Sequence, residues 1–488
     1  MSTGSLFPDA RNFQRQSDDF ALWLSQQPGV KLSPKIRISD LRPQGSGRGV
    51  GMFALPILVA SSDIEEGEEL FTIPRTIILT VQNSRLNNHI PQELAELGPW
   101  LSLILVMIHE NLLRDQSLWK PYFNVLPTEF DTLMFWTEQE LSSLQASAIL
   151  DKIGKQEAEQ SILETLLPVV RSHPELFPPT PEIPSFDGDI GAKSLLRMAH
   201  RMGSLIMAYA FDIEKAEDDE ETGEDGYLTD DEDQLPKGMV PLADLLNADA
   251  DRNNARLFQE ETSLVMRTIK PVKAGDELFN DYGEIPRADL LRRYGYITDN
   301  YTKYDVVELP LPLICQAAGL EDVESKPYPQ LELLEQLDLL EDGYCVPRPL
   351  SDESLEDILP DELLVLLKVL TLDGEELQQR REKNKPPKPS LGGQEAQILL
   401  DAAQAKLSQY ATTIEQDLQT LQQLAPISGL DTSTRRHKMA IQVRVGEKEV
   451  LYQVSLMLAN LIPSDAQATK KRAADTTLQG LLHKKGKN

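Results

Sequence analysis

Cysteine is almost absent from this chain, which has only Cys315 and Cys345 among its 488 residues. A structural zinc cluster takes four ligands at close spacing, and a disulfide framework needs several pairs of cysteines. The sequence therefore argues against both kinds of crosslink and predicts no metal site. Because free cysteine is among the most buried residue types, we expect both thiols in the interior.

Long apolar runs are missing as well. No stretch approaches the roughly 18 apolar residues that a membrane-spanning helix requires. The first residues also lack the basic start, apolar centre and small-residue cleavage site of a secretory signal. We therefore expect a soluble, intracellular protein that does not contact membranes.

Positive charge is scarce, since 48 lysines and arginines stand against 78 acidic residues, for a net charge of −30. Phosphate contacts need clustered basic side chains, so this balance argues against direct binding of nucleic acid. A basic protein partner fits the charge, although an acidic surface also serves solubility alone. Residues 212–235 hold thirteen acidic residues and one lysine, which predicts a disordered loop; a docking strip for a basic substrate is the alternative.

The length exceeds the 250 to 300 residues, roughly, that one hydrophobic core supports, so at least two domains are expected. Strand patterns near residues 36–73 and 257–280 flank a long helical stretch, and helical patterns resume after residue 301. This order predicts an α+β protein. We expect an N-terminal flank with a short helix at 20–27 (residues 1–35), a β-containing domain with a helical insertion at about 85–238 (36–300), a helical domain (301–465) and a basic disordered tail (466–488).

The helical half contains one long amphipathic pattern at residues 394–424. Its apolar stripe consists of Leu400, Ala403, Leu407, Tyr410, Ile414, Leu418 and Leu421. A coiled-coil scaffold is one interpretation, but the buried face of a second domain is favoured. The basic tail that follows, with lysine and arginine at 470–472, is either a nuclear address or a frayed terminus.

Three separate motifs carry the functional signal. Glycines alternate through residues 45–51, which allows positive φ angles and close approach to a ligand. Asn247 follows the apolar run 241–246, where burial would require partners for its amide. Residues 277–283, Glu-Leu-Phe-Asn-Asp-Tyr-Gly, indicate a strand that leaves into a turn. Taken singly, they fit a hairpin corner, a satisfied core asparagine and a buried tyrosine.

Together and in this order, the motifs resemble a SET domain. The long helical insertion, the helical second half and the runs 241–249, 290–296 and 446–448 are similar to the Rubisco large-subunit methyltransferase class, most of all to its fungal ribosomal lysine N-methyltransferase 4 branch. The resemblance covers roughly residues 18–465. It implies a knotted β SET fold with a long helical insertion, followed by an all-α substrate-binding domain, and S-adenosylmethionine as the cofactor.

The resemblance also implies roles for individual residues. The cofactor would be bound by Arg48, Gly49, Val50, Gly51, Tyr209, Asn247, Ala248 and Tyr282. Tyr282 would be the catalytic tyrosine, while Tyr209 and Tyr294 would line the lysine channel. Ala248 stands where most SET domains have histidine, which excludes an imidazole role but leaves backbone contacts available.

Methyl transfer to lysine suits these residue types. The amine must be neutral, and at pH 7 deprotonating a lysine of pKa 10.4 costs about 4.6 kcal/mol. A narrow aromatic channel offsets part of this cost by desolvating the ammonium form. The resemblance thus implies a protein-lysine methyltransferase, most simply for a 60S ribosomal protein; the acidic charge fits a basic substrate, and we expect a location in the nucleus or also in the cytoplasm. Histones, transcription factors, histidine methylation and a non-catalytic SET-like binding module are the alternatives.

Overall fold

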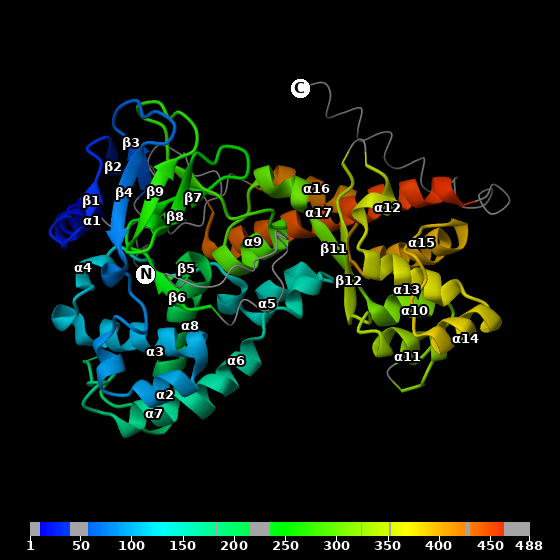
Figure 1. Ribbon diagram of the computed structural model, residues 1–488, viewed down its shortest axis with the longest axis horizontal. Coiled ribbons are helices and arrows are strands. Elements are labelled where there is room, and N and C mark those ends of the chain that lie inside the picture. The colour runs from blue at the N-terminus through cyan, green and yellow to red at the C-terminus, as the bar shows by residue number, and fades with distance from the viewer. Residues whose placement is uncertain are drawn as a thin grey trace.

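The computed structural model describes residues 10–39, 57–181, 183–214, 235–323, 325–350, 353–424 and 430–462. The glycine-rich turn at 45–51, nearly all of the acidic segment and the basic tail lie outside these residues, so the expectations about them stay predictions. Figure 1 shows most of the strands at one end of the long axis with the insertion helices beside them, and the C-terminal helices with a further strand pair toward the other end.

The central sheet has four strands in the order β1-β4-β9-β8, all antiparallel. Its strands are β1 (Lys31–Leu32), β4 (Glu69–Pro74), β9 (Ser263–Thr268) and β8 (Ala255–Gln259). Four consecutive residues of β4 are buried, including Phe71 and Ile73, which belong to the same hydrophobic core as residues of the insertion helices. Chain segments on either side of the insertion therefore meet in one sheet. A neighbouring pair joins β2 (Ile36–Ser39) to β3 (Ile57–Ala60).

The first helix, α1 (Ala10–Ser25), begins ten residues earlier than the helix we predicted at 20–27. The run from Ser17 to Asp19, whose residue types are typical of a helix cap, lies inside the helix. The Ser17 hydroxyl donates to the Phe13 carbonyl at 2.9 Å, a bond that lets serine sit within a helix. Phe20 and Leu24 are fully buried and anchor α1 to the core.

The insertion is helical, as expected from its sequence. Its helices are α2 (Pro91–Glu96), α3 (Gly98–Leu113), α4 (Lys120–Phe123), α5 (Glu138–Leu141), α6 (Lys155–Ser161), α7 (Leu167–Ser172) and α8 (Gly188–Tyr209). Most of α3 is buried, which agrees with its almost wholly apolar sequence. After α8, strand β5 (Ala210–Asp212) pairs with β6 (Lys237–Met239) and returns the chain to the sheet region.

The C-terminal half is mainly helical, but our expectation of an all-α domain is wrong in one respect. Strands β11 (Val306–Pro310) and β12 (Gly343–Pro347) form an antiparallel pair, with alternate residues buried in each. The helices are α10 (Leu311–Ala317), α11 (Pro329–Gln336), α12 (Leu355–Ile358), α13 (Asp361–Thr371), α14 (Gly374–Lys383), α15 (Gly393–Ser408), α16 (Ile414–Gln423) and α17 (Thr432–Leu461).

The predicted long helix at 394–424 is two helices, α15 and α16. Thr413 starts a new helix there, because its side chain accepts from the backbone N–H of Gln416 and the Gln416 side chain accepts from the backbone N–H of Thr413. Leu400, Ala403, Tyr410 and Ile414 of the stripe are buried, so it is the face of a packed domain. Cys315 is buried here as expected, whereas Cys345 is partly exposed.

Helix α17 connects the two halves of the molecule (Figure 1). Its first half packs with the insertion and α9 (Arg287–Tyr294), through Met439, Ala440 and Val443. Its second half packs in the core of the C-terminal half, through Val450, Val454 and Leu458. The thirty-residue helix therefore belongs to both cores.

Candidate active site

Two very short strands set up the site. Strand β7 (Asn247–Ala248) runs parallel to β10 (Phe279–Asn280), so Asn247 lies beside Phe279 and Ala248 beside Asn280. The backbone N–H of Leu278 also donates to the Leu58 carbonyl at 2.9 Å, which fixes this pair against β3. The two distant motifs of the sequence are thus brought together.

The Asn247 side chain is exposed, although its neighbours Leu246 and Ala248 are buried. Its Nδ2 donates to Glu277 Oε1 at 2.7 Å. Burial raises the pKa of Glu277 to about 7, against the effect of the hydrogen bond from Asn247. The sequence suggested a buried asparagine; the structure shows its amide at the edge of the strand pair, paired with a carboxyl group.

A group of tyrosines lies next to this strand pair. The Tyr282 and Tyr294 rings are stacked, with their centroids 4.2 Å apart and their planes 9° from parallel. Tyr294 meets Tyr296 edge to face at 6.3 Å. The Tyr282 hydroxyl donates to the Leu246 carbonyl at 3.3 Å, one residue before Asn247. The predicted Asn247, Ala248, Tyr282 and Tyr294 therefore share one site.

Tyr209 joins the group from the last position of α8. Burial, and then the nearby charge of Asp244 and the phenol of Tyr294, raise the pKa of Tyr209. Burial together with the neighbouring phenols likewise raises the pKa of Tyr282 well above its ordinary value. Both side chains stay protonated at neutral pH, so they can donate hydrogen bonds but cannot act as bases.

Sequence reasoning missed two members of the site. Tyr296 was within reach, because it follows Tyr294 at a spacing of two in a motif that had been noted. Asp244 is buried, accepts from the Tyr122 hydroxyl, and has its pKa raised to about 7 by burial. Its position in the apolar run before Asn247 was a signal, since a buried carboxyl group needs a purpose or a partner.

The loop between β7 and β8 is held by one buried carboxylate. Asp249 Oδ2 accepts from Arg252 at 2.6 Å and from Asn300 at 2.8 Å, and Arg252 lies over the Phe279 ring at 4.6 Å. Burial opposes ionisation of Asp249, but these hydrogen bonds outweigh it and lower its pKa. This ion pair fixes the β7 end of the site.

Within the described parts of the chain, no helix is long and apolar enough to cross a bilayer, and no three His, Cys, Asp or Glu side chains are grouped as metal ligands. Arg48, Gly49, Val50 and Gly51, which were predicted to bind the cofactor, fall in the part of the chain that the structure does not describe. Their place relative to Asn247 stays a prediction.

Comparisons with known proteins agree with this geometry. The SET domain model matches residues 57–283, and the Rubisco LSMT substrate-binding model matches residues 329–451. The chain is 31% identical to ribosomal lysine N-methyltransferase 4 of Saccharomyces cerevisiae over 74% of its own length and 72% of that protein. It is 30% identical to N-lysine methyltransferase setd6 of Xenopus laevis, over 89% and 93%.

A crystal structure of the SET domain of LSMT bound to lysine and AdoHcy superposes with a TM-score of 0.65. It covers 91% of both chains at 22% identity, which shows that the two share a fold across both halves.

Proposed function

This chain belongs to the SET-domain family of protein-lysine N-methyltransferases, which use S-adenosylmethionine, and from that membership we propose that it methylates a lysine of a 60S ribosomal protein. The observation that carries the chemistry is the stacked pair of Tyr282 and Tyr294 beside the β7–β10 strands. The choice of a ribosomal substrate is supported by the name of the yeast relative and by the net charge of −30, which favours encounters with lysine-rich proteins.

The residues at the strand pair suit the cofactor. Because the Asn247 amide is exposed at the strand edge and, among the described residues, its side chain bonds to Glu277 alone, it can turn toward a ligand placed there. We assign Asn247 and the backbone of Ala248 to the methionine and adenine ends of S-adenosylmethionine, together with the backbone of residues 48–51. When bound, the cofactor supplies an electrophilic methyl group on a sulfonium.

The tyrosine group would form the lysine channel. Aromatic walls from Tyr209, Tyr294 and Tyr296 exclude water and so favour the neutral amine over the ammonium ion. The Tyr282 hydroxyl, anchored toward the Leu246 carbonyl, would orient the nitrogen lone pair. Since burial keeps these phenols protonated, the proton of the substrate ammonium leaves to solvent rather than to a tyrosine.

The deciding experiment is methyl transfer to 60S ribosomal proteins purified from cells that lack this enzyme. Labelled S-adenosylmethionine and mass spectrometry would locate the modified lysine, and Tyr282→Phe should lower the rate by about a hundredfold through lost positioning. The Tyr282→Phe variant should still bind the cofactor. Labelling of histones but not of 60S proteins would reject the ribosomal substrate.

The second candidate is a non-ribosomal basic substrate. The setd6 relative supports considering it, because its name specifies no ribosomal substrate and that similarity extends over more of both chains than the yeast similarity does. A panel of histones assayed beside the 60S proteins separates the two substrates in one experiment.

We propose a nuclear location for the enzyme on the basis of the basic residues at 470–472 and 484–487. Removal of residues 469–488 should shift a fluorescent fusion from the nucleus to the cytoplasm. An unchanged distribution would show that the tail is not an address.

A further inference from the structure

We infer that the helical C-terminal half positions the tyrosine wall of the active site, through two buried carboxylates that fix the two ends of helix α9. The carboxylates are Asp305 at its N-terminal end and Asp131 at its C-terminal end. The inference rests on the proposed role of Tyr294, the last residue of α9, in the lysine channel. It makes Asp305 and Asp131 positioning residues for methyl transfer.

At the N-terminal end, Asp305 caps α9 from outside the helix. Its Oδ1 accepts from the backbone N–H of Arg287 at 3.3 Å, and its Oδ2 accepts from Arg287 Nη2 at 2.6 Å. Pro286 makes no side-chain cap there, so the Asp305 carboxylate satisfies one of the free backbone N–H groups of the first turn, that of Arg287. A carboxylate at this position also interacts favourably with the helix dipole. Both side chains are only 6% exposed.

Asp305 is in turn held by the C-terminal half. Arg348, just after β12, donates from Nη2 to Asp305 Oδ2 at 3.2 Å and to the Gly446 carbonyl at 3.3 Å. Gly446 lies within α17, and a side chain there would collide with Asp305 and come within 2.6 Å of Arg287 Nη2. Only glycine lets α17 pack this closely over the ion pair.

At the C-terminal end, α9 stops at Gly295 in the left-handed conformation, with φ at +76°. A β-carbon on Gly295 would lie 2.9 Å from the backbone nitrogen of Thr132, so the turn fits tightly against the segment at 131–132. The carboxylate of Asp131 in that segment is buried and forms ion pairs with Arg435 at 2.5 Å and Arg436 at 3.0 Å, both from the start of α17.

An isolated helix of eight residues is unstable in water, so the position of α9 depends on what holds its ends. The N-terminal end of α9 contacts Asp305, over which α17 packs at Gly446. The C-terminal end contacts the segment at 131–132, which α17 binds through Arg435 and Arg436. The ring of Tyr294 lies 4.2 Å from Tyr282, and a small shift of α9 would change that stacking and the width of the channel. The helical half is therefore part of the catalytic geometry as well as a binding surface.

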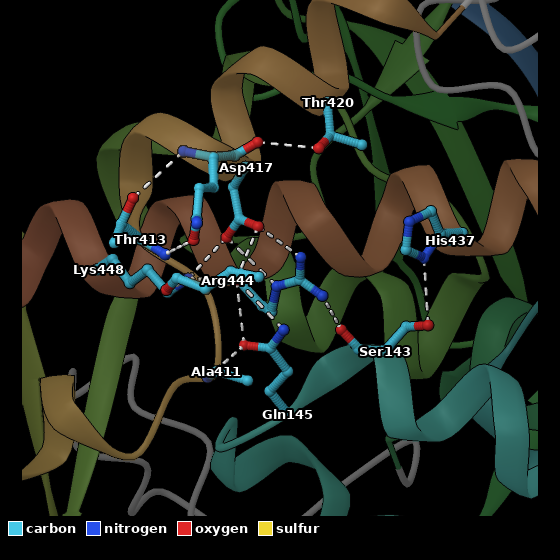
Figure 2. Close-up of polar contacts among 11 residues, drawn as sticks. Ser143, Gln145, Ala411, Thr413, Asp417, Thr420, His437, Arg444 and Lys448 are labelled. Carbon is cyan, nitrogen blue, oxygen red and sulfur yellow. Dashed lines mark hydrogen bonds and ion pairs between the residues drawn. The ribbon is translucent and has the colours of Figure 1, made fainter.

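The test compares two buried aspartates that both bond cations near α17. Asp417 accepts from Arg444 and Lys448 at 2.6 Å each, in the group of contacts drawn in Figure 2. Those partners belong to α17 and Asp417 itself to α16, and within the described residues no hydrogen bond of the Asp417 side chain reaches α9. Asp417→Asn is therefore the matched control for Asp305→Asn: both weaken a buried ion pair, but only one lies at α9.

We expect both variants to have a lower Tm, and only Asp305→Asn to lose about tenfold or more in kcat, because small misplacements of reacting groups are costly. Its KM for the protein substrate and its cofactor Kd should stay within about twofold of wild type, since docking surfaces are untouched. The ratio of mono-, di- and trimethylated product should also change. The assays are run well below the Tm of each variant. Their substrate is the one that the wild-type enzyme labels, either a 60S protein or a histone.

A second variant guards against misfolding of the first. Gly446→Ala removes no polar group, but its methyl group would displace the Asp305–Arg287 pair, so it should reproduce the kcat loss. Gly374→Ala is the control: a methyl group there meets nothing within 4 Å, so kcat should not fall. Equal kcat losses in the Asp305 and Asp417 variants would mean a merely structural role and would overturn the inference.

A crystal structure of Asp305→Asn supplies a readout that does not need activity. We expect Tyr294 to be displaced from Tyr282, whereas an unchanged 4.2 Å stacking distance would reject the inference. Failure of wild-type enzyme to label 60S proteins would count against the proposed substrate alone.

Discussion

At the scale of single residues, the partner of a buried carboxyl group decides its charge. Glu447 accepts from the neutral hydroxyls of Ser147 at 2.6 Å and Tyr410 at 2.7 Å, and burial raises its pKa to about 7. Asp417 is also buried, but hydrogen bonds from Arg444 and Lys448 outweigh the cost of burial and lower its pKa. Raising the pH therefore weakens the stabilising contribution of Glu447, whereas lowering the pH weakens that of Asp417.

Glu447 predicts a measurable pH dependence of stability. A folded pKa above the unfolded value of 4.5 means that its stabilising contribution is complete below pH 4.5 and is lost as pH rises toward about 7. As pH rises across this window, the unfolding free energy of Glu447→Gln relative to wild type should therefore increase by on the order of 3 kcal/mol. Urea denaturation at several pH values measures it, with the exposed Glu157→Gln as control. Parallel pH profiles for wild type and Glu447→Gln would contradict the assignment.

At the scale of elements, sequence patterns predicted what local chemistry controls. The apolar run in α3 predicted a buried helix and the pattern of β9 predicted a strand, while the motifs around Asn247 and Tyr282 indicated the site. The β11–β12 pair was missed because its residues lie between helical patterns and pair across an intervening segment. The role of Asp305 could not be predicted either, since its partners Arg287, Arg348 and Gly446 meet only after the two halves have packed.

The end of α9 allows a test at this scale. Gly295→Ala should destabilise the protein by about 1–3 kcal/mol, because it combines a left-handed backbone with a clash against Thr132. Gly319→Ala has a similar φ of +84° but open space around the new methyl group, so it should cost only the backbone strain, about 1 kcal/mol. Thermal and urea unfolding would measure both. Equal losses in the two variants would mean that the packing of Gly295 against Thr132 is loose.

At the scale of the whole molecule, buried aspartates are paired with cations while the chain as a whole is acidic. Three buried aspartates are each bonded to two cationic side chains, in the groups Asp131 with Arg435 and Arg436, Asp305 with Arg287 and Arg348, and Asp417 with Arg444 and Lys448. These six cations are used inside the protein. These groups hold three negative and six positive charges, so the net charge of −30 comes from acidic residues elsewhere in the chain, and it can act on a substrate at a distance.

This surface charge predicts that kcat/KM for a lysine-rich protein falls as salt rises, by about tenfold between roughly 0.05 and 0.3 M, because screening weakens electrostatic steering. The affinity for S-adenosylmethionine should change far less, and measuring it under the same conditions provides the control. Replacing the eleven acidic residues of 217–233 by their amides removes about a third of the net charge. If the whole surface steers the substrate, most of the salt dependence should survive this change. Its complete loss would instead identify the acidic segment as a docking strip, and a rate independent of salt in the unmodified enzyme would contradict electrostatic steering altogether.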